Sequence, residues 1–210
     1  MKQTKEQTAI ANKIKKWLKT AEETQTETRY FGLPITRLTS IKSFCKNDLH
    51  SAQQFALFIT QRIFQKMNEM SCPEWSSVED WNIDKKLIAD SINQMKNYLQ
   101  TPSSEGKQVF RTLLKEIENR QGDDIRRVHW NTIHFVRSGY LLKLEYGLRC
   151  FIDYDYPYWV YKLAREYVEE KDGITTESVP MLLEISEFWC QYYFGQSLRE
   201  KFSNLVPKKV

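Results

Sequence analysis

Apolar residues recur at intervals of three and four along most of this chain, with polar residues between them. This spacing matches the turn of an α-helix, and no strand-like alternation of useful length accompanies it. Residues 48–70 show it most clearly, through Leu49, Ala52, Phe55, Ile59, Ile63 and Met67. The pattern predicts an all-α fold, a helical bundle of about six helices.

Prolines, glycines and capping residues divide the pattern into separate helices. We predict a short helix near 38–44 and longer helices over about 48–70, 77–101, 104–121, 124–153, 157–170 and 176–203. Asn47 or Asp48, then Ser77, then Ser103 or Ser104 are the expected N-terminal caps. Gly122 is placed to end the helix that begins near residue 104.

The longest of these patterns is the one over residues 124–153, where glycine at 139 and 147 is the only interruption. On a helical wheel at 100° per residue, its apolar arc contains Val128, Phe135, Leu142 and Cys150. The opposite arc also becomes apolar in the second half of the segment. We therefore predict a long central helix with the other helices packed around it.

The first twenty residues combine an apolar stripe with a strong positive charge. Ile10, Ile14, Trp17, Leu18 and Ala21 are spaced for one helix face. Six lysines and one glutamate give this segment a charge of +5, so with a net charge of +4 the other residues sum to −1. We predict a basic amphipathic arm and polar linker over 1–35, outside a helical domain over 36–210.

Such an arm suits an anionic membrane or an acidic protein groove. The residues that would contact either partner are Lys13, Lys15, Lys16, Trp17 and Lys19. Docking of the arm onto the chain's own domain is the alternative. Nucleic-acid binding is only a third interpretation, because the positive charge is confined to the arm.

A second candidate is the stretch RRVHWNTIHFVRSGY, residues 126–140. One face of the predicted helix gathers Arg126, Arg127, Trp130, His134 and Arg137. Guanidinium groups around an indole can bind a carboxylate, a phosphate or an acidic partner. The alternative is ordinary pairing of these arginines with acidic residues of adjacent helices. His129 lies in the apolar arc and is expected to pack in the core.

Aromatic residues are concentrated in the last part of the chain, with thirteen of the 28 between residues 146 and 194. The densest group includes Tyr154, Tyr156, Tyr158 and Trp159. Tyrosine and tryptophan combine a large apolar surface with a polar tip. Three interpretations stay open: a bulky core between the last helices, a surface for a protein partner, and a pocket for a small molecule or pigment.

Signatures of catalysis and metal binding are missing from the sequence. The cysteines at 45, 72, 150 and 190 are far apart and are expected to be reduced thiols. Asp153 and Asp155 are expected to act as cap and turn residues, and Glu184 and Glu187 lack the histidine of a di-iron motif. We predict no catalytic residue, no metal and no cofactor, and a cytoplasmic location with an arm suited to peripheral membrane contact.

Two stretches, GDDIRRVHWNTIHFVRSGYLLKLEYGLRCFIDYDYPYWVYKLAREYVEE and VPMLLEISEFWCQYYFGQSLREKF, resemble segments of uncharacterised helical proteins of cyanobacterial type. They cover about a third of the chain. The resemblance implies a bacterial cytoplasmic setting and a partner in a photosynthetic cell, and no catalytic residue carries over.

These features favour a non-enzymatic interaction protein, an adaptor or a regulator. It would bind a protein partner through the aromatic C-terminal region and the Arg/Trp face. The alternative is an enzyme or a carrier of a small molecule or pigment that uses the aromatic region as a pocket. Weak nucleic-acid binding through the arm is the third interpretation.

Overall fold

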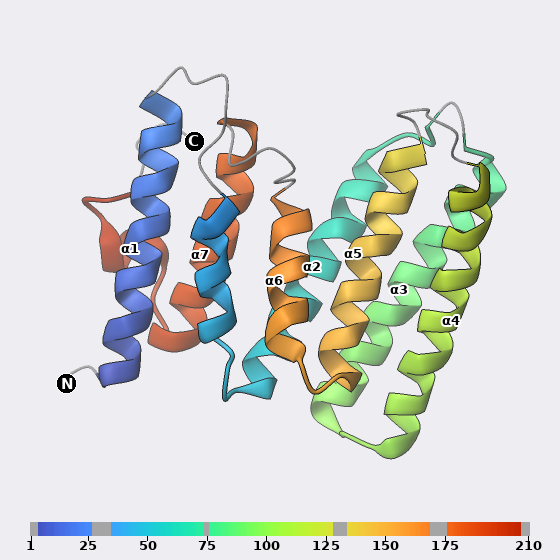
Figure 1. Ribbon diagram of the computed structural model, residues 1–210, viewed down its shortest axis with the longest axis horizontal. Coiled ribbons are helices and arrows are strands. Elements are labelled where there is room, and N and C mark those ends of the chain that lie inside the picture. Colours follow the sequence, from blue (N-terminus) through green and yellow to red (C-terminus); the bar gives the residue numbers. More distant parts are fainter. Residues whose placement is uncertain (1–3, 27–34, 74–75, 128–133, 169–175, 207–210) are drawn as a thin grey trace. The chain divides into compact units, whose positions relative to one another are not determined.

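The computed structural model describes residues 4–26, 35–73, 76–127, 134–168 and 176–206, and these residues form helices and no strand (Figure 1). The elements are α1 (Lys5–Thr26), the 3-10 helix η1 (Ile35–Ser43), α2 (Leu49–Glu69), α3 (Val78–Gln100), α4 (Ser104–Arg127), α5 (His134–Ile152), α6 (Tyr156–Tyr167), the 3-10 helix η2 (Thr176–Ser178), α7 (Val179–Phe194) and α8 (Leu198–Phe202). The predicted all-α class is confirmed. Within the described residues, no helix is both long and apolar enough to cross a membrane.

Three helices begin at capping side chains that the sequence predicts. The Asp48 carboxylate accepts a hydrogen bond from the Ser51 backbone N–H at 2.9 Å. At the start of α3, the Ser77 hydroxyl accepts from the Asp80 backbone N–H at 3.0 Å. At the start of α4, the Ser103 hydroxyl accepts from the Gly106 backbone N–H at 2.9 Å. Each cap satisfies a backbone donor that has no partner within the first turn.

The helix predicted over 176–203 is interrupted at Gly195. This residue adopts a left-handed φ of 62°, and its N–H donates to the Gln191 carbonyl at 2.9 Å, which closes α7. Ser197 and Glu200 then form a reciprocal capping box that begins α8. The prediction of one continuous helix is therefore wrong at this point.

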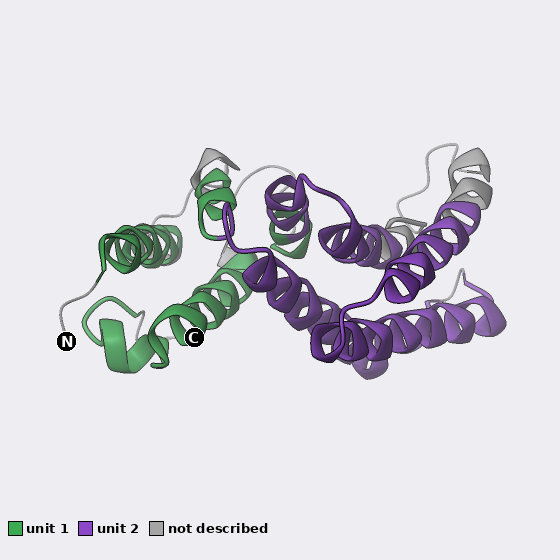
Figure 2. Cartoon of the chain, turned by 90° about the horizontal axis from the view of Figure 1, so that it is seen from below, with its two compact units in different colours: residues 1–44, 164–210 green, residues 45–163 purple. Residues whose placement is uncertain are grey.

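Two compact units make up the chain: unit 1 contains residues 1–44 and 164–210, and unit 2 contains residues 45–163 (Figure 2). This division differs from the expected boundary at residue 35. The difference arises because α1 packs against α7 within unit 1, so the segment expected to be an arm belongs to a compact unit.

Unit 1 is built on the apolar stripe of α1. Ile14, Leu18 and Ala21 are completely buried, and Trp17 is 1% exposed. The Phe44 ring contacts two indoles, with its centroid 4.9 Å from that of Trp17 and 5.2 Å from that of Trp189. Of the two arrangements that the sequence leaves open for α1, the structure has the docked one.

Unit 2 contains α2, α3, α4 and α5 packed along one another (Figure 1). Gly147 brings α5 close to α2, because a Cβ atom at this position would lie 3.0 Å from the Thr60 hydroxyl. Rings of Tyr98, Phe110 and Phe151 fill the space between α3, α4 and α5, at centroid distances of 4.8 to 5.8 Å. These three rings are buried and join α3, α4 and α5 in the core of unit 2.

The long central helix predicted over 124–153 is wrong. Residues 124–127 complete α4, and Gly122 lies inside α4 instead of ending it. Since α4 and α5 lie side by side (Figure 1), they cannot be parts of one straight helix. Residues 128–133, where the predicted helix would continue, lie outside the described part of the structure.

Replacement of Trp17 by alanine tests the docking of α1. Loss of a fully buried indole is expected to lower the free energy of unfolding by about 3–5 kcal/mol. Lys16→Ala, one residue away on the exposed face, should change it by less than about 0.5 kcal/mol. Urea unfolding followed by circular dichroism measures both values, and equal small losses would contradict the docked arrangement.

Candidate functional site

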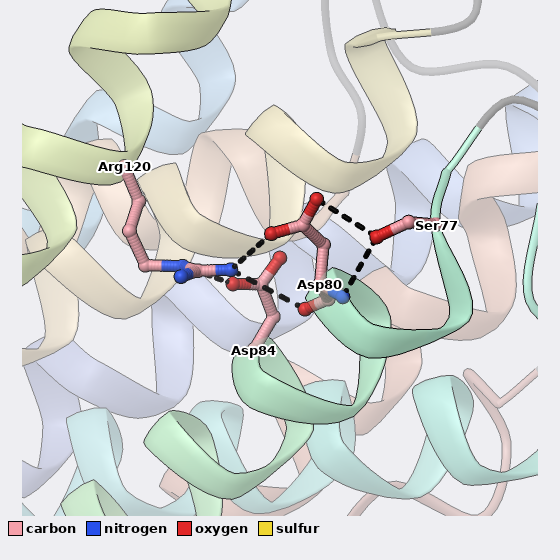
Figure 3. Close-up of polar contacts among 4 residues, drawn as sticks. All are labelled: Ser77, Asp80, Asp84 and Arg120. Carbon is pink, nitrogen blue, oxygen red and sulfur yellow. Dashed lines mark hydrogen bonds and ion pairs between the residues drawn. The ribbon is translucent and has the colours of Figure 1, made fainter.

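An ion network joins α3 to α4 in unit 2 (Figure 3). Arg120 Nε lies 2.5 Å from Asp84 Oδ1, and an Arg120 terminal nitrogen lies 3.2 Å from Asp80 Oδ1. That nitrogen also donates to the Asp80 carbonyl at 3.3 Å, and the Ser77 hydroxyl donates to the second Asp80 carboxylate oxygen at 2.9 Å. Because the Asp84 side chain is only 1% exposed, this network is a structural clamp between helices.

A second network surrounds Arg149, near the end of α5. Its guanidinium lies 2.8 Å from Glu145, 3.5 Å from Glu118 of α4 and 3.6 Å from Asp153. The carbon of the same guanidinium lies 4.8 Å from the ring centre of Trp159, in α6. One side chain therefore connects α4, α5 and α6 by charge and by a cation–π contact.

The electrostatics of Arg149 reflect this environment. Burial by itself lowers the pKa of the guanidinium, but the hydrogen bond and charge of Glu145, with the charges of Asp153 and Glu118, outweigh it and raise the pKa. The side chain still has 25% of its surface exposed. Arg149 is thus a fixed cation that a binding partner can reach.

Aromatic side chains continue this site along α6. The Trp159 ring lies 5.5 Å from Tyr146 and 5.1 Å from Tyr158. The Tyr156 hydroxyl donates to the Lys46 carbonyl at 3.2 Å. Tyr154, at the turn between α5 and α6, is 97% exposed. Of the four aromatic residues predicted from the sequence, Tyr158 and Trp159 therefore pack against other rings, Tyr156 makes a hydrogen bond, and Tyr154 projects into solvent.

We refer to Arg149, Asp153, Tyr154, Tyr158 and Trp159 as the α5–α6 corner. Asp153 takes part in ion pairing, and the Asp155 carbonyl accepts the Tyr158 N–H at 3.0 Å, as befits a turn residue. Sequence reasoning did not select Arg149 as a site residue. The available signal was its spacing of four residues from both Glu145 and Asp153 along one helix.

The Arg/Trp face predicted from residues 126–140 cannot be assembled from the described side chains. Arg126 and Arg127 end α4, and His134 and Arg137 belong to α5, but the side chains of all four lie outside the description. Trp130 and His129 fall in the segment 128–133, which also lies outside it. This face remains a prediction.

The predicted arm residues separate into two groups. Trp17 is buried, and the Lys13 ammonium donates to the Ser43 hydroxyl and lies 5.5 Å from the Phe44 ring centre. Burial, together with the charge of Lys16, lowers the pKa of Lys13. Lys15, Lys16 and Lys19 are exposed, and Lys19 pairs with Glu23 at 3.7 Å. Of the five predicted arm residues, Lys15, Lys16 and Lys19 are therefore the ones available to a partner.

Acidic residues of α7 serve structural contacts. Tyr167 donates its hydroxyl to Glu184 at 2.5 Å, and Glu187 accepts from the Leu198 N–H at 2.8 Å. Among the residues that the structure describes, no group of histidine, cysteine and carboxylate side chains is arranged to hold a metal ion.

No protein-family model matches the chain, and neither a curated protein nor a solved structure matches it. The resemblance to helical proteins of cyanobacterial type therefore gains no support from these comparisons. Functional inference has to rest on the chain's own residues and their geometry.

A double-mutant cycle tests the role of the Arg120 network. Arg120→Leu leaves the buried Asp84 carboxylate without its guanidinium and is expected to destabilise the chain by about 3 kcal/mol. The double variant Arg120→Leu/Asp84→Leu should lose clearly less, because no buried charge is then left behind: the Asp80 carboxylate, which also loses its contact with Arg120, is 46% exposed. Chemical denaturation gives all the values, and a double variant less stable than Arg120→Leu would refute the clamp.

The four cysteines should differ in reactivity. Burial raises the pKa of Cys45 to about 12 and that of Cys190 to about 11, and it raises the pKa of Cys150 as well. Higher pKa values mean less thiolate near pH 8, so these thiols should resist iodoacetamide. Cys72, which is partly exposed, should be alkylated first. Peptide mass spectrometry locates the label, and early labelling of Cys45 would contradict this order.

Proposed function

We propose that the protein is a non-enzymatic interaction protein that binds a protein partner through the α5–α6 corner. The observation that carries the proposal is Tyr154, a large aromatic side chain that is 97% exposed beside the Arg149 network. Tyrosine, tryptophan and arginine are the residues that most often dominate the binding energy of protein interfaces.

The geometry around Arg149 supports this role. Three carboxylates and the Trp159 ring hold the guanidinium in place, so less conformational entropy is lost when a partner binds. The Arg149 network itself, with one positive and three negative side chains, carries two excess negative charges. A partner that presents lysine or arginine next to an apolar surface is complementary to it.

An enzyme or a carrier of a small molecule remains the alternative. It would use Tyr156, Tyr158 and Trp159 to line a pocket, whereas these side chains contact Lys46, Lys162 and Arg149. No observation on the described residues favours this alternative or nucleic-acid binding. The cytoplasmic location also stays a prediction.

The proposal can be tested by capture of partners from the lysate of the source organism with the full chain as bait. A protein that binds through the corner should be retained by the wild type and reduced about tenfold or more by Tyr154→Ala, as for an interface hot spot. Ile83→Ala is the matched control, because this apolar side chain of α3 is 38% exposed. The control should capture the same protein as the wild type.

The midpoint of thermal unfolding should be the same for the wild type, Tyr154→Ala and Ile83→Ala, since neither of the replaced side chains is buried. Equal capture by wild type and Tyr154→Ala would contradict the proposal. Native mass spectrometry of protein purified from the source organism adds a second measurement. A retained small molecule that is lost in Trp159→Ala would favour the carrier.

A further inference from the structure

The outward face of α1 carries a row of lysines. Lys5, Lys15, Lys16 and Lys19 are exposed, and at 100° per residue they fall within an arc of about 100°. The buried stripe that contains Trp17 occupies the opposite side of the helix. Packing in unit 1 therefore turns these four cations toward solvent.

This row is straight and long. Between Lys5 and Lys19 the helix rises roughly 21 Å, at 1.5 Å per residue. Lys19 has an acidic neighbour in Glu23, at 3.7 Å, and Glu22 lies at the same end of the helix. The remaining three lysines lie further toward the helix N-terminus, where Glu6 is the only acidic residue among the described residues of α1 before Glu22.

The other side chains on this face narrow the range of partners. Thr8, Ala9 and Asn12 are exposed, short and uncharged. Among the described residues of α1, this face has no arginine or aromatic side chain that could stack on a base or contact it with two hydrogen bonds. It also lacks an apolar anchor of the kind that dominates protein interfaces, because Trp17 and its neighbours are buried.

We infer that the lysine face of α1 binds the surface of an anionic lipid bilayer by charge alone, while α1 stays packed in unit 1. A bilayer presents a continuous negative plane, so all four cations can approach headgroups at once without a matching groove. Lysine residues close to such a surface each strengthen binding, and salt screens the attraction. The inference is independent of the protein partner at the α5–α6 corner.

This mode differs from the insertion of a free amphipathic helix. Insertion would place the apolar stripe between lipid chains, which requires Trp17 to leave its contact with Phe44. Binding through the lysine face leaves that contact intact. The predicted attachment is accordingly weak, reversible and shallow.

The test is cosedimentation of the full chain with phosphatidylcholine vesicles that contain or lack phosphatidylserine. We expect binding only to the anionic vesicles, at low salt, with strong loss at high salt. Lys15→Glu/Lys16→Glu should weaken it on the order of tenfold or more. The matched control is Lys86→Glu/Lys96→Glu, which makes the same change in net charge at exposed lysines of α3 and should bind as the wild type does. Circular dichroism melts should show that both variants keep the stability of the wild type.

Several results would overturn the inference. These are no binding to anionic vesicles at low salt, equal binding to neutral vesicles, and an equal loss of binding in the α3 control. Binding to a DNA duplex that exceeds vesicle binding and depends on the same two lysines would assign the face to nucleic acid instead. Quenching of tryptophan emission by brominated lipid would show insertion and rule out attachment by charge alone.

Discussion

The contact of the Phe44 ring with Trp17 and Trp189 is the interaction on which unit 1 depends. It joins α1 and α7 with the residue that follows η1, although these segments are far apart in the sequence. The Tyr193 hydroxyl donates to the Phe44 carbonyl and strengthens the same point. Because this packing buries the apolar stripe of α1, it also decides which side of that helix meets solvent.

The helices that the sequence predicted best are those whose ends depend on local chemistry. Asp48, Ser77 and Ser103 each cap a helix through a residue three positions ahead, and such contacts can be recognised from spacing alone. The prediction of one helix over 124–153 was wrong because this segment contains no proline and keeps a helical period. Whether residues 124–127 belong with α4 or with α5 depends on how these helices pack, which a local pattern does not encode.

The candidate site was predictable only in part. Local composition drew attention to Tyr154 and its aromatic neighbours, but not to the cation that organises them. Arg149 gains its role from Glu118, which is 31 positions away, just as Arg120 depends on Asp84 at a separation of 36. Ion pairs between helices are a result of the tertiary fold, so a single sequence indicates which charges are present but not which of them meet.

The two units also differ in whether their residues are consecutive in the sequence. Unit 2 is a continuous stretch, residues 45–163, whereas unit 1 needs residues before 45 and after 163. During synthesis from the N-terminus, unit 2 can therefore fold while α7 has not yet been made. Until α7 is made, no α7 residue can cover the apolar stripe around Trp17. The stripe of α1 is therefore exposed to chaperones or to other nascent chains for the time needed to translate the whole of unit 2.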